Sequence, residues 1–133
     1  MKTILMALVL SCSALASASP RNLECTGTWS WMKTKSTITA KVASNERILD
    51  VTDSSGKVEK NDLVADPNYR PTKYKGFNRF SYRVNENDVI GESWCDLILP
   101  ENVAERTNSF KAYNVCKADK GGGTLRLTCK FVK

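Results

Sequence analysis

Most of the chain beyond residue 20 alternates between apolar and polar positions with a period of two. The clearest case is segment 78–84, which places Phe80, Tyr82 and Val84 on one face and polar residues on the other. This spacing is typical of a β-strand with one buried face. Further strands are predicted, from alternation or from short apolar runs, at 23–31, 36–42, 47–51, 93–99, 110–116 and 125–133.

Turn-forming residues separate these segments. Residues 53–56, 85–88 and 119–123 are rich in Asp, Asn, Ser and Gly, and each predicts a turn. Residues 60–76 contain prolines and a glycine and predict a long excursion without regular structure, whereas 101–108 could form a helical turn after Pro100. Seven or so strands at this spacing predict an all-β fold, either a small antiparallel β-sandwich or a β-barrel.

The first 18 residues have the three-part pattern of a secretory signal peptide. Lys2 supplies a positive charge, residues 4–10 are apolar, and Ala16 and Ala18 are the small residues at −3 and −1. We therefore expect cleavage after Ala18 and a secreted or periplasmic protein with one domain, residues 19–133. The apolar run is too short to span a bilayer. Residues 9–12 also loosely resemble a bacterial lipobox, in which acylation of Cys12 would tie the protein to a membrane.

Removal of the signal leaves four of the five cysteines: Cys25, Cys95, Cys116 and Cys129. An even number of cysteines in a small exported domain predicts two disulfides. Zinc binding is the competing interpretation, but the four form no Cys-x-x-Cys pair and the chain has no histidine. Of the three possible pairings we favour Cys95–Cys116, across neighbouring strands, and Cys25–Cys129, which would tie the ends of the domain together.

The charge and the missing histidine narrow the possible functions. Removing 18 of the 133 residues takes away Lys2 and leaves 115, with 19 Lys and Arg against 14 Asp and Glu, a net charge of +5. Such a charge suits acidic partners or an anionic surface, although many exported proteins carry it for solubility alone. Without histidine the chain lacks Ser-His-Asp and Cys-His nucleophile activation and most transition-metal sites. We therefore expect a protein that binds rather than catalyses, with no cofactor or metal.

Cations and aromatic rings are interleaved in residues 69–83, YRPTKYKGFNRFSYR, a segment without any acid. Its candidate binding residues are Tyr69, Arg70, Lys73, Tyr74, Lys75, Phe77, Arg79 and Arg83. An anionic polymer would use such a segment, with the cations on its charges and the rings for stacking. The structural alternative places Phe80 and Tyr82 in the core and Arg79 and Arg83 on the solvated face of the same strand.

The sequence thus predicts an exported binding protein that engages an anionic polymer, or a protein partner in the manner of an inhibitor, through loops and residues 69–83. An extracytoplasmic address disfavours nucleic acid. The alternative is a small secreted hydrolase with a carboxylate pair, for which Asp96 beside Trp94 is one candidate. A binder should expose aromatics near residues 69–77 and have no cleft, whereas a hydrolase should have a pocket with two converging acids.

Gly27-Thr28-Trp29, near the start of the β-rich domain, resembles the Gly-x-Trp of calycin barrels such as lipocalins and avidins. The resemblance covers three residues and implies a barrel whose floor is plugged by Trp29. The other interpretation is an ordinary core tryptophan on a first strand, and the remaining strands show no further match to those families.

Overall fold

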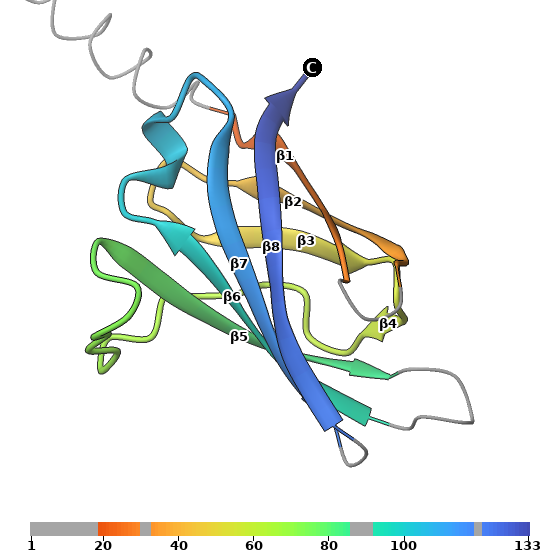
Figure 1. The fold of residues 1–133 in the computed structure, drawn as a ribbon. Helices are drawn as coiled ribbons and strands as arrows, with labels where there is room; N and C mark the ends of the chain where they lie inside the picture. The colour runs from red at the N-terminus through yellow and green to blue at the C-terminus, as the bar shows by residue number, and fades with distance from the viewer. Residues whose placement is uncertain (1–18, 30–32, 86–91, 119–120) are drawn as a thin grey trace, which may run out of the picture.

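The computed structural model describes residues 19–29, 33–85, 92–118 and 121–133. The predicted signal at 1–18, with Cys12, lies outside these residues, as do Trp31 and all but the first residue of the turn predicted at 85–88. The described residues form eight strands and a short 3₁₀ turn (Figure 1). These are β1 (Arg21–Thr28), β2 (Lys35–Val42), β3 (Ile48–Asp53), β4 (Lys57–Val58), β5 (Phe77–Asn85), β6 (Glu92–Pro100), η1 (Val103–Glu105), β7 (Phe110–Ala118) and β8 (Gly121–Val132).

The strands form one antiparallel sheet that curls round on itself. Its order is β3-β2-β1-β8-β7-β6-β5-β4, and the last strand returns to pair with the first. Consecutive strands are therefore neighbours, except for β3 and β4, which form the two edges of the sheet. Figure 1 shows the resulting nearly closed barrel. The prediction of an all-β antiparallel fold is therefore confirmed, and of its two architectures the barrel is the correct one.

The barrel wall between β3 and β5 is completed by the segment that contains β4. Ile48 and Leu63 exchange backbone hydrogen bonds of 3.0 and 2.7 Å, while the Glu59 amide donates to the Arg83 carbonyl at 3.1 Å. The same stretch of chain thus bonds to both neighbouring strands. β4 was not predicted, because a two-residue strand is too short to show any periodicity.

The core lies inside the barrel at the positions that the alternation predicts. On β5 the exposed fractions of Phe80, Tyr82 and Val84 are 0%, 4% and 0%. The inward apolar residues of β2 and β6 are buried in the same way, as are Leu125 and Leu127 of β8. Period-two alternation therefore identified the inner faces of β2, β5, β6 and β8 correctly.

The predicted turn at 119–123 is wrong in its second half, because its three glycines belong to β8. Gly121, Gly122 and Gly123 pair with Ala118, Lys117 and Cys116 of β7. A Cβ atom on Gly122 would lie 2.3 Å from the Cys116 carbonyl oxygen. The glycine thus permits a close approach of two strands, a role that consecutive glycines in a sequence do not distinguish from a turn.

The helical turn predicted within 101–108 is present as η1, which covers one end of the barrel. The Arg21 guanidinium donates to the Ala104 and Arg106 carbonyls at 2.8 and 2.7 Å, and it lies 3.7 Å from the centroid of the Phe131 ring. The Ala104 amide donates to the Glu46 carboxylate at 2.8 Å. These contacts tie η1 to β1, to β8 and to the turn between β2 and β3.

Both predicted disulfides are confirmed. Cys25–Cys129 joins β1 to β8 and Cys95–Cys116 joins β6 to β7, with Cα–Cα distances of 4.0 and 4.1 Å. In each pair the two cysteines are direct register partners. Two disulfides are consistent with an oxidising, extracellular environment. Within the described residues, no helix is long and apolar enough to cross a membrane.

Trp29 follows β1 directly and packs, half-buried, against the core. Its indole Nε1 donates to the Ser36 hydroxyl at 3.1 Å. A Cβ atom on Gly27 would lie 2.3 Å from the Arg126 carbonyl oxygen of β8, so the glycine permits the close approach of the two strands here. A barrel, which the Gly-x-Trp resemblance implies, is observed. The partly buried Trp29 also fits the other interpretation, an ordinary tryptophan packed against the core.

A hydrogen-bonded group of polar side chains lies inside the barrel wall. The Tyr82 hydroxyl donates to Asp53 at 2.6 Å and accepts from the Asn114 amide at 3.0 Å, and all three residues are buried. Ser55 donates to the second Asp53 oxygen from both its amide and its hydroxyl. Burial, with the adjacent Asp53 carboxylate, raises the pKa of Tyr82 well above its ordinary value of 10.0.

We expect Tyr82→Phe to lower the unfolding free energy at neutral pH by about 1–3 kcal/mol, because it leaves Asp53 and Asn114 without a buried partner.

The raised pKa of Tyr82 also makes the stability of the wild type depend on pH. The contribution of this group is fully present only below pH 10.0, the ordinary pKa of a tyrosine. Above it, the unfolded state releases the Tyr82 proton first, and stability falls by about 1.4 kcal/mol per pH unit until the folded pKa is reached. Urea unfolding between pH 8 and 11.5 should show a shallower alkaline decline in Tyr82→Phe. Phe80→Leu is the control, since it disturbs the same strand without removing a titrating group, and equal slopes in all three proteins would contradict the assignment.

The two disulfides should differ in their contribution to stability. Their sequence separations are 104 residues for Cys25–Cys129 and 21 for Cys95–Cys116. The chain-entropy model then gives about 4.7 and about 3.3 kcal/mol. Urea unfolding of the Cys25→Ala/Cys129→Ala and Cys95→Ala/Cys116→Ala variants should therefore show the larger loss in the first. A larger loss of stability in the Cys95→Ala/Cys116→Ala variant would contradict this prediction, because the disulfide that closes the longer loop would then not be the more stabilising one.

Candidate functional site

Residues 64–76, here called the strap, leave the barrel wall after Leu63 and return to it at Phe77. In Figure 1 the strap is the green loop beside β5. Its two ends are fixed by backbone hydrogen bonds of 2.9 Å, from the Asp66 amide to the Arg79 carbonyl and from the Glu101 amide to the Gly76 carbonyl. The strap thus holds most of the predicted binding residues in an irregular segment that is anchored at both ends.

Aromatic side chains attach the strap region to the outer face of the sheet. The ring centroid of Tyr74 lies 4.5 Å from that of Tyr113 on β7, and the ring of Phe77 lies 5.8 Å from Tyr113. Ile98 of β6 is the register partner of Tyr113 and points outward, because its two neighbours in the strand face the core. It is nevertheless only 2% exposed. We call Tyr74, Phe77 and Tyr113 the aromatic cluster. Tyr69, Tyr74 and Phe77 are half-buried, whereas a binder was expected to expose its aromatics here.

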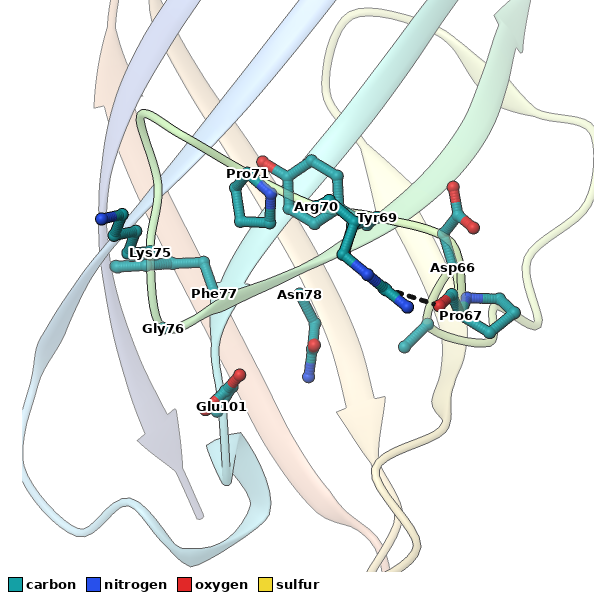
Figure 2. A pocket seen from close by; sticks show the side chains of 11 residues that line it. Asp66, Pro67, Tyr69, Arg70, Pro71, Lys75, Gly76, Phe77, Asn78 and Glu101 are labelled. Carbon is teal, nitrogen blue, oxygen red and sulfur yellow. Dashed lines mark hydrogen bonds between the residues drawn. The ribbon is translucent and has the colours of Figure 1, made fainter.

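The cations of the strap are exposed. Lys73 and Lys75 extend from its surface, with the Lys73 ammonium 5.5 Å from the centroid of the Tyr74 ring. Arg70 donates to the carbonyls of Pro67 and Tyr69, each at 3.0 Å (Figure 2). Backbone acceptors orient the Arg70 guanidinium, but they leave its charge unneutralised.

The two arginines of β5 are in a different position, because each pairs with an acid. Arg79 forms a salt bridge with Asp66 and lies 4.8 Å from the centroid of the Tyr69 ring. The hydrogen bond from Arg79 lowers the pKa of Asp66 below its ordinary value. Arg83 forms a salt bridge of 3.3 Å with Glu59. The structure therefore separates the strap lysines from the two arginines, which the sequence had grouped together.

An open pocket of about 540 Å³ lies between the strap and the turn that follows β6. Four of the eight predicted binding residues line it: Tyr69, Arg70, Lys75 and Phe77. Two acids, Asp66 and Glu101, also line it. Figure 2 shows Asp66 near Pro67 at one end and Glu101 below Gly76. A concave feature is thus present, contrary to the expectation of no cleft for a binder.

Asp66 is not suited to be the general acid of the hydrolase alternative. The pKa of Asp66 is lowered by its pairing with Arg79, whereas a general acid needs a raised pKa. Asp96, the acid singled out from the sequence, is not among the residues that line the pocket. Its carboxylate accepts a hydrogen bond of 2.6 Å from the Ser81 hydroxyl on the outer face of β5 and β6.

Sequence reasoning missed the cations that β7 and β8 present on this face. Lys111 and Lys117 of β7 and Arg126 and Lys130 of β8 are exposed, and neither strand contains an Asp or Glu. Arg126 is the register partner of Tyr113, which places it beside the aromatic cluster. The sequence contained a signal for Arg126, because predicting that Leu125 and Leu127 face inward also predicts that Arg126 faces outward. What the sequence did not show is that these strands lie next to the strap.

Comparison with protein-family models, with curated proteins and with solved structures finds no match for this chain.

The pairing of Asp66 with Arg79 can be tested directly. We expect the carboxyl pKa of Asp66, followed by NMR titration, to lie below the ordinary 3.8 and to rise toward it in Arg79→Gln. Arg70→Gln is the matched control, because the Arg70 charge is the smallest of the contributions that lower this pKa. An equal rise in both variants would show that general positive charge, rather than the Arg79 hydrogen bond, sets the pKa.

Proposed function

We propose that this chain is an exported, non-enzymatic binding protein that engages an anionic polymer through a cationic patch on the outer face of the barrel. The patch consists of the exposed cations around the aromatic cluster: Lys73, Lys75, Lys111 and Arg126. It keeps the strap lysines predicted from the sequence and adds the cations that pairing with β7 and β8 brings beside them.

The observation that carries the proposal is the division between paired and unpaired cations. Arg79 and Arg83 have acidic partners, whereas no described residue forms an ion pair with any of the four patch cations. Their charges add to one another at the surface, because β7 and β8 contain no acid to offset them. A polyanion gains affinity from such a patch by releasing the counterions it had condensed.

The anchored strap also favours binding. Hydrogen bonds at both ends of the strap and the packing of Tyr74 on Tyr113 hold the segment before any partner arrives. Less conformational entropy is then lost on association than with a free loop. A barrel stapled by two disulfides provides a rigid support for this surface.

The proposed location follows from two independent features. The signal-peptide pattern of residues 1–18, with cleavage after Ala18, supports export to a secreted or periplasmic site. The two disulfides suit the oxidising conditions found there. Extracytoplasmic polyanions, rather than nucleic acids, are then the expected partners.

The test is binding of heparin and of inorganic polyphosphate to the mature domain by isothermal titration calorimetry at two or more salt concentrations. We expect affinity to fall with salt, and Lys73→Ala/Lys75→Ala to reduce the magnitude of the log–log salt slope by about one to two. Lys35→Ala/Lys41→Ala removes the same charge from β2, outside the patch, and should leave the slope nearly unchanged.

Equal losses in both double variants would show that net charge alone attracts the polymer. Binding that does not depend on salt or on the strap lysines would overturn the proposal and leave a protein partner as the function to pursue.

A further inference from the structure

Trp94 of β6 is an exposed aromatic residue on the same outer face of the sheet. It is 54% exposed, and the Arg83 guanidinium lies 3.7 Å from the centroid of its ring. Arg83 is itself held by Glu59. The indole is therefore fixed in place on one side while more than half of its surface remains accessible, which is an unusual position for so large an apolar group.

The strand register connects Trp94 to the cationic patch. Trp94 pairs with Lys117 of β7, which is exposed. Along the outward face of β7, Lys117 lies about 13 Å from Tyr113 and about 20 Å from Lys111, at a rise of about 3.3 Å per residue. Lys111 and Lys117 thus mark the two ends of a line along the outer face of β7, here called the track, with the aromatic cluster near one end and Trp94 at the other.

Between its two aromatic ends the track is bordered by an acid. Asp96 lies two residues from Trp94 on the same face, pairs with Val115 of β7 and accepts a hydrogen bond from Ser81. A carboxylate here repels a polymer with a phosphate on every unit. It can accept hydrogen bonds from hydroxyl groups, which a sugar chain provides.

We infer that the anionic polymer is an acidic polysaccharide and that Trp94 is a platform on which one of its sugar rings stacks. This inference rests on the proposed function and adds the chemical class of the ligand. The axial C–H bonds of a sugar ring fit the electron-rich face of an indole, much as positive ring edges fit aromatic faces. The cations at 111, 117 and 126 engage the acidic groups of the chain, and Asp96 accepts its hydroxyls.

Three probes of similar total charge separate the possible ligands: a heparin oligosaccharide, an oligodeoxythymidylate and inorganic polyphosphate. Only the first two contain rings, and only the first is rich in hydroxyls. We expect Trp94→Ala to weaken heparin binding about tenfold and to leave polyphosphate binding within about twofold of the wild type. Trp94→Phe should restore part of the loss, because an aromatic face is kept.

Val132→Ala is the matched control, since it removes an exposed apolar side chain outside the track. Circular dichroism and the melting temperature check that each variant is folded.

Each other outcome counts against a distinct statement. If Lys73→Ala/Lys75→Ala weakens all three probes but Trp94→Ala weakens none, the platform is wrong and the cationic patch stands. If the oligodeoxythymidylate binds most tightly and depends on Trp94, the ligand is a single-stranded nucleic acid. If Trp94→Ala changes the oligomeric state in light scattering, this face is a contact between copies of the chain. If no probe binds, the proposed function fails as well.

Discussion

The pairing of the first strand with the last is the constraint on which the rest of this structure depends. β1 and β8, the first and last strands, form one ladder, and Cys25–Cys129 links them at directly opposed positions. Without that pairing the sheet would keep two further open edges, and the apolar inner faces of its strands would lose the enclosure that buries them. Gly27 serves the same contact, because only a residue without Cβ lets β1 approach the Arg126 carbonyl so closely.

Closure of the barrel also determines where binding chemistry can occur. The inward positions are filled mainly by apolar side chains and by the hydrogen-bonded Asp53–Tyr82–Asn114 group. The outward positions of β5 to β8 then carry the charges. The strap adds a second layer over part of this face and turns a flat sheet into a surface with an aromatic cluster, a pocket and projecting lysines.

Electrostatic pairing divides the cations of this face into two groups with different roles. Arg79 and Arg83 pair with acids and lie over the rings of Tyr69 and Trp94, so they hold the strap region and the indole in place. The lysines of the strap and the cations of β7 and β8 point into solvent and remain available to a polyanion. The structural interpretation of 69–83 thus describes part of the segment, whereas the proposed binding role rests on its exposed lysines.

The sequence by itself determined most of the strands, the inner faces of those with clear alternation, and the helical turn, because alternation and turn signals are local properties of the chain. The cysteine count predicted two disulfides but left three pairings open, of which the favoured one is observed. It did not reveal β4 or the strand role of Gly121–Gly123, since these depend on the close approach of a partner strand. Nor did it show that Tyr113 and Arg126 lie beside the strap, or that Asp66 neutralises Arg79. These contacts join residues far apart along the chain, and only the register of a closed sheet decides which of them meet.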